Sequence, residues 1–255
     1  MTDSLRALLS HLIDYAGLYP PAGLPLEEVL ERYRRYQVSP ESWMLNRLVL
    51  PAAKLGEVRL EEGWRVTALV AGEVGRLPKQ VESVESKTPL PYGRGSGGVY
   101  VEAPLAQITD GFAKIRTGGL TPEAIPPSQQ LAEFLHAAAE RRLAFKATAG
   151  LHHPIRGEYP LTYAPDAPRA VMHGFLNVFA AAAFAWIHAP VTMIEEILEE
   201  TDSRAFEFLD GEMLWRGRGM GTAQIEDARA NFAHSFGSCS FEEPVAGLRE
   251  LGLLP

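Results

Sequence analysis

Two lysines lie in short segments that otherwise have the composition of buried β-strands. Lys114 belongs to FAKIRTGG and Lys146 to FKATAG. Because alternate residues of a strand share a face, Lys114 points the same way as Arg116. Lys146 likewise points the same way as Thr148, and the apolar residues between them point to the opposite face. Each strand thus presents a polar face, where a buried ammonium group needs an anion to offset the cost of desolvation.

The two lysine segments end in similar turns, TGG and TAG. Glycine permits positive φ and lets backbone N–H groups approach a phosphate or carboxylate closely. We expect these turns to bind an anion, although a tight turn after a strand has the same sequence. The residues that we expect to bind substrate are Arg116, Thr117, Gly118, Gly119, Thr148, Gly150, Arg156 and Asn177.

Two adjacent histidines and one glutamate supply acid–base groups. His152 and His153 follow the second lysine segment, and Glu102 follows the strand-like VYV. Histidine titrates near neutral pH, so one of the pair is a candidate for proton transfer, with Glu102 as an alternative base. The predicted catalytic residues are therefore Lys114, Lys146, His152, His153 and Glu102. A structural explanation stays open, in which each lysine pairs with a carboxylate such as Glu102 at a rim.

A metal site would need further ligands at a suitable spacing. Adjacent histidines in an extended segment point opposite ways, and no HxxxH or CxxC pair accompanies them. One of these histidines together with Glu102 and either His173 or His188 is the alternative set. The leading interpretation includes no metal ligand and no cofactor.

Helical and strand-like segments alternate along the chain, which is typical of a parallel sheet covered by helices. The sequence predicts one α/β domain over residues 1–255, a (β/α)8 barrel that is irregular in its C-terminal third. The predicted strands are 13–17, 46–52, 64–72, 99–104, 112–119, 143–150, 204–211 and 234–241, and 79–98 is expected to pass from a short helix into a loop. In such barrels the active site lies at the C-terminal ends of the strands, where the candidate residues fall.

The segment FEFLDGEMLW has a second interpretation. Its Asp-Gly pair is a strong signal for a β-hairpin. With a hairpin there, the barrel would be distorted or incomplete, and an open doubly wound sheet becomes the alternative. A dinucleotide site is not indicated, because GRGSGG precedes a strand rather than following one.

The composition excludes several classes of partner. The formal net charge of −8 disfavours nucleic acid and anionic membranes. The most apolar segment, 174–187, is shorter than the about 20 residues of a membrane span. The N-terminal segment lacks the form of a secretory signal, and a single cysteine allows no intramolecular disulfide. We expect a cytoplasmic protein whose partner is a small anionic metabolite, and a homo-oligomer stays open.

Two resemblances bear on function. FKATAG resembles the strand-six lysine segment of class I aldolases of the deoxyribose-phosphate type, in which the Schiff-base lysine lies in a similar Lys-x-Ser/Thr-x-Gly run. It implies that Lys146 captures a carbonyl and that Lys114 lowers its pKa, although here the second lysine lies on the preceding strand rather than the following one. Over its length the chain resembles a family of uncharacterised bacterial proteins with DYAGLYPP, KxRxGG, FKATAGLHHP, HGFLN and GSCSFEEP segments, which implies that these form one site.

We therefore predict a lyase that acts on a small anionic carbonyl compound, with or without a phosphate, by imine-based aldol cleavage or isomerisation. Two alternatives remain. One is a lyase or hydrolase assisted by a divalent metal. The other is a protein that binds an anionic metabolite without turning it over.

Overall fold

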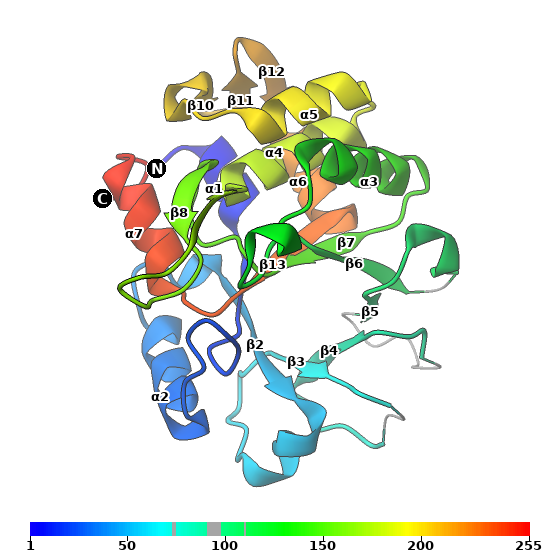
Figure 1. Cartoon of the computed structure of the whole chain (residues 1–255), viewed down its shortest axis with the longest axis vertical. Helices are drawn as coiled ribbons and strands as arrows, with labels where there is room; N and C mark the ends of the chain where they lie inside the picture. The colour runs from blue at the N-terminus through cyan, green and yellow to red at the C-terminus, as the bar shows by residue number, and fades with distance from the viewer. Residues whose placement is uncertain (73–74, 91–97, 110) are drawn as a thin grey trace.

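The computed structural model describes residues 1–72, 75–90, 98–109 and 111–255, and its centre is a closed barrel of eight parallel strands (Figure 1). Around the barrel they follow in the order β1, β13, β7, β6, β5, β4, β3, β2. They are β1 (Ile13–Tyr15), β2 (Leu45–Pro51), β3 (Val66–Leu69), β4 (Val81–Ser86), β5 (Val99–Val101), β6 (Phe112–Arg116), β7 (Phe145–Thr148) and β13 (Ala233–Ser238). The predicted α/β barrel is confirmed.

One of the eight strands differs from the prediction. Residues 204–211 do not enter the barrel; they contribute β10 (Phe206–Phe208), which pairs antiparallel with β11 (Glu212–Trp215) around the Asp-Gly turn. The eighth strand of the barrel is instead β4, which the sequence does not predict. It lies in the segment that is expected to pass from a short helix into a loop. Its inward residues, such as Ser83 and Glu85, are polar because they face hydrogen-bonding partners in the lumen, so the strand lacks the usual apolar alternation.

α-Helices cover one side of the barrel. In Figure 1 they gather beside β6, β7 and β13. They are α3 (Ser128–Glu140), α4 (Phe175–Trp186), α5 (Val191–Glu199) and α6 (Thr222–Asn231), while α1 (Asp3–Leu9), α2 (Leu26–Gln37) and α7 (Glu242–Glu250) lie elsewhere around it. Between β2 and β6 the helices formed by the described residues are all short 3₁₀ helices, so loops and these short helices cover that side.

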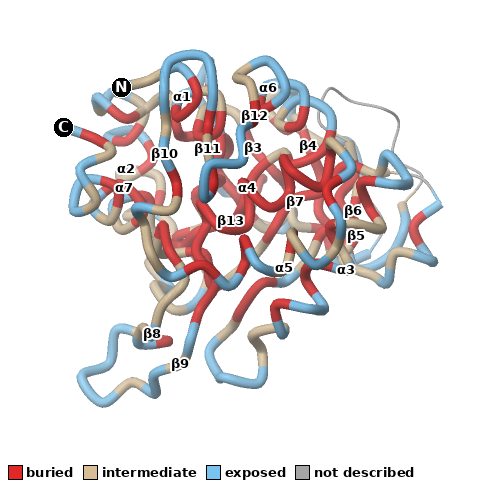
Figure 2. Tube along the Cα trace, turned by 90° about the horizontal axis from the view of Figure 1, so that it is seen from above, coloured by how far each residue is buried: buried red, intermediate tan, exposed pale blue. Residues whose placement is uncertain are grey.

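The C-terminal third is irregular, as predicted. Between β7 and β13 the chain forms the hairpin β8 (Gly157–Pro160) and β9 (Arg169–Met172), then α4 and α5, then a small sheet of β10, β11 and β12 (Arg218–Gly221). Figure 2 shows the β8–β9 hairpin standing out from the molecule, whereas β7, β13 and α4 are buried at its centre.

The apolar core lies between the outside of the barrel and the helices. Every residue of α4 is buried. Phe145, on the outer face of β7, stacks on Phe179 of α4 and meets Phe232 edge to face. Burying each such ring contributes roughly 1.5–3 kcal/mol. This packing holds the register of β7 and thereby positions its inward lysine. Among the described helices, α4 included, none has the length and hydropathy to cross a membrane.

Candidate active site

A continuous row of alternating charges crosses the barrel lumen. It runs from Asp14 to Lys146, Glu85, Lys114, Glu102 and Arg116, each group paired with the next. Three carboxylates thus match three cations. Lys114 and Lys146 are register partners on β6 and β7, and their shared inward face agrees with the period of two in the sequence.

Lys146 lies at the inner end of this row, with 1% of its side chain exposed. Its Nζ lies 2.5 Å from Oδ2 of Asp14 and 2.5 Å from Oε1 of Glu85. Asp14 is held in turn, because Ser235 Oγ donates to Oδ2 at 2.8 Å and Asn46 Nδ2 donates to Oδ1 at 2.7 Å. Lys146 therefore has the anions that a buried ammonium group requires.

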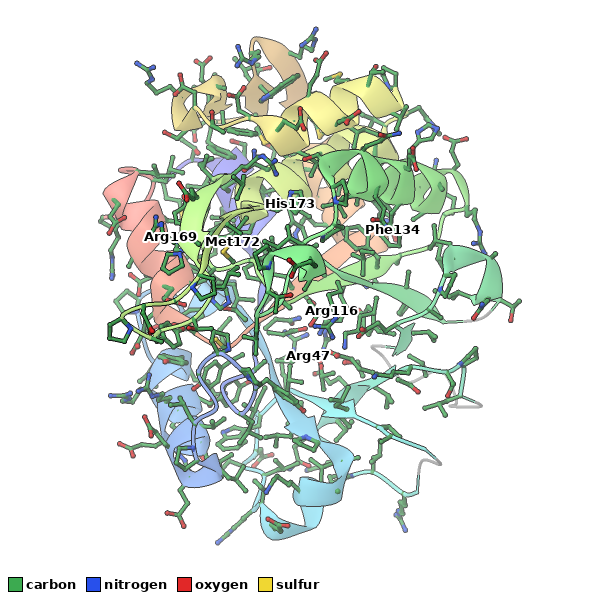
Figure 3. All side chains as sticks on the ribbon, in the orientation of Figure 1. Arg47, Arg116, Phe134, Arg169, Met172 and His173 are labelled. Carbon is green, nitrogen blue, oxygen red and sulfur yellow. The ribbon has the colours of Figure 1, made fainter. Side chains whose placement is uncertain are left out.

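Lys114 lies further along the row, toward the exposed end. Its Nζ lies 2.8 Å from Oε2 of Glu85 and 3.0 Å from Oε2 of Glu102. Arg116, which is 48% exposed, binds Oε1 of Glu102 through Nη2 at 3.1 Å. Figure 3 shows Arg116 between the strands in the middle of the molecule. Lys114 forms the ion pair with Glu102 that the sequence suggests. Both of its carboxylate partners also bind a second cation, since Glu85 binds Lys146 and Glu102 binds Arg116.

The row shifts the pKa values of its members. Burial alone would raise the pKa of Glu85, but the ammonium groups of Lys146 and Lys114 outweigh it and lower the pKa from 4.5 to about 2. Burial alone would lower the pKa of Lys146, but the carboxylates of Asp14 and Glu85 outweigh it and raise the pKa. This direction is opposite to the one that the aldolase resemblance implies for Lys146. At neutral pH this lysine is a protonated ammonium group.

A cavity of about 540 Å³ opens at the C-terminal end of the barrel. Glu85 contributes to its wall, and apolar side chains such as Leu69 and Met172 form other parts of it. Seven residues predicted from the sequence line it: Lys114, Arg116, Gly118, Gly119, Thr148, Gly150 and His152. The described residues that line this wall do not include Lys146. The amine that a ligand in the cavity can reach is therefore Lys114.

The turns after β6 and β7 pack backbone against backbone. A Cβ on either Gly118 or Gly150 would lie 2.8 Å from the Cα of the other. Ala149 and Gly150 have positive φ, and Thr117 Oγ1 donates to the carbonyl of Ala149 at 2.6 Å. Thr117 thus has a structural contact in place of the predicted contact with substrate. The N–H groups of Gly118, Gly119 and Gly150 have no hydrogen-bond partner among the described residues, so these tight turns still leave donors for an anion.

His152 is the histidine that reaches the cavity. Its Nδ1 lies 2.9 Å from Oε2 of Glu243, a geometry that makes Nδ1–H the donor and leaves the lone pair on Nε2. Tyr163 donates its hydroxyl to the same oxygen at 2.9 Å. The ring of His153 instead stacks on Tyr159, with centroids 3.5 Å apart, and burial lowers its pKa to about 4. His152 rather than His153 can therefore exchange protons with a molecule in the cavity.

Arg156 and Asn177 do not take the substrate-binding positions that the sequence predicts. Asn177 is fully buried, and its Oδ1 accepts a hydrogen bond from the N–H of Arg156 at 2.9 Å. Its Nδ2 donates to the carbonyls of Ile197 and Glu200, both at 2.8 Å. Nη1 of Arg156 lies 3.4 Å from His173. Asn177 thus satisfies backbone groups of Arg156 and of the end of α5, in keeping with the rule that buried polar groups are hydrogen-bonded.

Four further candidates are not predicted from the sequence: Asp14, Tyr19, Glu85 and Glu243. Asp14 has a signal, since it is an acid between two apolar residues of a predicted strand. Glu85 lies in β4, where the sequence predicts a short helix followed by a loop. The Tyr19 hydroxyl is buried without a hydrogen-bond partner among the described residues, and Tyr19 lines the cavity. Glu243 reaches His152 from α7, a contact that only the fold creates.

The metal-binding set considered from the sequence is not assembled. His173 Nε2 lies 2.8 Å from the carbonyl of Pro126, and His188 lies 3.0 Å from Glu140 on the surface. Glu102 contacts Lys114 instead. Within the described ranges, no group of three His, Cys, Asp or Glu residues could hold a metal ion.

The chain matches no protein-family model. Curated proteins and solved structures give no significant match either. Any assignment of function therefore rests on the charged row and on the cavity that meets it at Lys114.

Proposed function

We propose that the protein is an enzyme that acts on a small anionic carbonyl compound through an imine with Lys114. The observation that carries the proposal is an amine on the wall of a cavity with two carboxylates within 3.0 Å. The resemblance of FKATAG to class I aldolases supports the reaction type. The burial of Lys146 favours exchanging the roles of the two lysines, so that Lys146 keeps Glu85 ionised and in place while Lys114 takes the carbonyl.

The reaction uses Lys114 and His152, which line the cavity, and Glu102, which contacts Lys114. Lys114 passes a proton to Glu102, its nitrogen attacks the carbonyl carbon, and loss of water leaves a C=N bond. Once protonated, this imine accepts the electron pair of the C–C bond that breaks in aldol cleavage. Nε2 of His152 takes the proton of the substrate hydroxyl whose oxygen becomes the new carbonyl. Protonation of the resulting enamine and hydrolysis of the imine release the second product and restore the amine.

The anionic part of the substrate would lie near Arg116. This guanidinium is half exposed although one side of it binds Glu102. Gly118 and Gly119, whose N–H groups have no hydrogen-bond partner among the residues that the structure describes, line the same cavity. A charged donor and backbone donors together suit a carboxylate or a phosphate. The apolar parts of the wall suit a short carbon chain.

Borohydride trapping tests the proposal. The protein is incubated with small aldehydes, keto acids and sugar phosphates, the imine is reduced, and intact mass and peptide mapping locate the adduct. We expect an adduct on Lys114 that Lys114→Met abolishes and that Lys54→Met, at an exposed surface lysine, leaves unchanged. An adduct on Lys146 would overturn the assigned roles of the lysines. No adduct with any compound would overturn the imine reaction and leave reversible binding of an anionic metabolite.

A further inference from the structure

The barrel has a second cavity, of about 590 Å³, at its opposite end. Its wall includes residues at or next to the N-terminal ends of strands, among them Asn46, Arg47, Tyr100, Ala144 and His234. The row of charges therefore separates two cavities that open at the two ends of one barrel. The proposed reaction uses no residue of this second cavity.

Arg47 brings a buried cation to this cavity. Its side chain points into the barrel from β2, and 9% of the residue is exposed (Figure 3). Nε donates to Glu82 at 2.9 Å, but the two terminal amino groups have no hydrogen-bond partner among the described residues. Arg65 binds the same carboxylate at 3.0 Å. One carboxylate thus serves two guanidinium groups, and this cluster keeps a net positive charge.

Arg229 adds a second positive charge to the wall. Its amino groups donate to the carbonyls of Ala233, His234 and Ser10, the last two at 2.7 and 3.0 Å. No carboxylate within the described part of the chain forms an ion pair with it, and its Nε is buried without a partner. Burial lowers its pKa to about 9, so the group remains charged at neutral pH. Arg229 is only partly exposed, and a charge withdrawn from water without a counterion destabilises a fold unless something compensates it.

The remaining groups on this wall do not supply that counterion. Glu226 is exposed. Burial, followed by the positive charge of Arg229, lowers the pKa of His234 to about 4, so its ring is neutral and accepts or donates a hydrogen bond with Tyr100 at 2.7 Å. Asp14, behind Asn46, is already paired with Lys146. The cavity therefore has an excess of donors and of positive charge.

We propose that this second cavity binds a small oxyanion, the phosphate or carboxylate group of a metabolite or a free ion of the same kind, between Arg47 and Arg229. Such a ligand gives acceptors to the two terminal amino groups of Arg47 and a counterion to Arg229. The cavity is larger than a single oxyanion, which leaves room for the organic part of a metabolite. This site is independent of the imine reaction at the other end.

Titration with two probes, inorganic phosphate and glycerol 3-phosphate, tests the site. Binding is followed by calorimetry and by the ring signals of ¹⁵N-labelled histidines, because His11 and His234 line this cavity whereas His152 lines the other. We expect a probe to shift the signals of His11 and His234. Tighter binding of glycerol 3-phosphate would support a metabolite as ligand, and equal binding would support a free oxyanion.

Variants separate this cavity from its surroundings. Arg47→Gln should weaken the binding of the probe by about tenfold or more, since it removes charged hydrogen bonds. Arg65→Gln removes a cation that shares Glu82 but does not line the cavity, so it should weaken binding less than Arg47→Gln does. Arg116→Gln alters only the other cavity and should bind the probe as the wild type does. The site is overturned if neither probe shifts His234 in the wild type, or if Arg116→Gln abolishes binding and Arg47→Gln does not. The wild-type measurement decides the question even if a variant fails to fold.

Discussion

Lys114 and Lys146 lie side by side on adjacent strands, and the carboxylate of Glu85 holds one of them with each oxygen. Without this bridge the two ammonium groups would repel each other in a region of low dielectric constant. The two lysines differ in their second partners, because Lys146 binds the buried Asp14 whereas Lys114 binds the partly exposed Glu102 and itself lines the cavity. We therefore expect both the stability of the lumen and the proposed reactivity of Lys114 to depend on Glu85.

Glu85→Gln should destabilise the fold strongly. The substitution leaves two lysines with one fewer carboxylate, and breaking a buried ion pair costs about 3–5 kcal/mol. Urea unfolding measures the free energy of unfolding. Glu61→Gln, at an exposed glutamate that binds Arg34, is the control and should cost about 1 kcal/mol or less. Equal losses in the two variants would contradict the importance assigned to the bridge.

Acid should destabilise the wild type through Glu85. Its pKa is about 2 in the folded protein, below the ordinary 4.5, so the unfolded chain takes up the proton first as the pH falls. Stability from this group is present above pH 4.5 and is lost as the pH falls from there through about 2. Urea unfolding between pH 7 and pH 2.5 should show a steeper decline for the wild type than for Glu85→Gln. Parallel curves would argue against the lowered pKa.

The two lysines should respond differently to removal. Lys146→Met leaves Asp14 buried with its main counterion missing, and we expect a loss of about 3–5 kcal/mol in urea unfolding. Lys114→Met leaves Glu85 paired with Lys146 and Glu102 paired with Arg116, so the loss should be about 1–2 kcal/mol. A larger loss for Lys114→Met would contradict its assignment to the cavity.

Gly150→Ala should be costly for two separable reasons. The new Cβ would lie 2.8 Å from the Cα of Gly118, and overpacking of this kind costs about 1–3 kcal/mol. The positive φ of residue 150 adds about 1–2 kcal/mol for a residue with a side chain. Gly63→Ala has a similar φ but open space around it, so it isolates the second effect. Comparable stabilities of the two variants in thermal unfolding would argue against the contact between the turns.

Tyr19→Phe should reduce trapping at Lys114 without destabilising the protein. The hydroxyl is buried on the cavity wall and has no partner within the described residues, so its removal leaves no group of the protein unpaired. A substrate oxygen would supply the missing partner. Tyr163→Phe is the comparison, because that hydroxyl already bonds Glu243. Unchanged trapping with Tyr19→Phe would remove Tyr19 from the site.

Glu243→Gln should change the tautomer of His152. With the carboxylate present, Nδ1 carries the proton and Nε2 is free to act as a base. An amide can either donate or accept, so the preference for this tautomer should weaken. The ¹⁵N chemical shifts of the His152 ring report the change, and those of His153, which stacks on Tyr159, should stay constant. A His152 ring that is unaffected would exclude Glu243 as its positioning residue.

The sequence predicts the barrel and its cationic strands because both depend on local alternation. Lys114 and Lys146 interrupt apolar strands at inward positions, which the period of two reveals directly. Glu85 is not predicted as a site residue, because its strand is polar on the face that pairs with those lysines. A strand whose inner face meets charges loses the apolar signal by which strands are recognised. The partners of buried charges are thus harder to find than the charges themselves.

Side chains near the site are harder to assign than strands. Asn177, in the first turn of α4, bonds backbone groups of Arg156 and Ile197, and the side chain of Arg156 contacts His173. Glu243 contacts His152 from a helix at the far end of the chain. Local spacing gives no information on such contacts, since they depend on how α4 and α7 pack on the finished barrel.

The late position of β13 sets the order in which the barrel can be completed during synthesis. β13 pairs with both β1 and β7, and Ser235 on it bonds Asp14, 221 residues earlier in the chain. Until residues 233–238 have left the ribosome, β1 and β7 each keep an unpaired edge, and such edges can pair with other chains. A chain cut or stalled before this point therefore carries two open edges, and Asp14 lacks one of the groups that hold it beside Lys146.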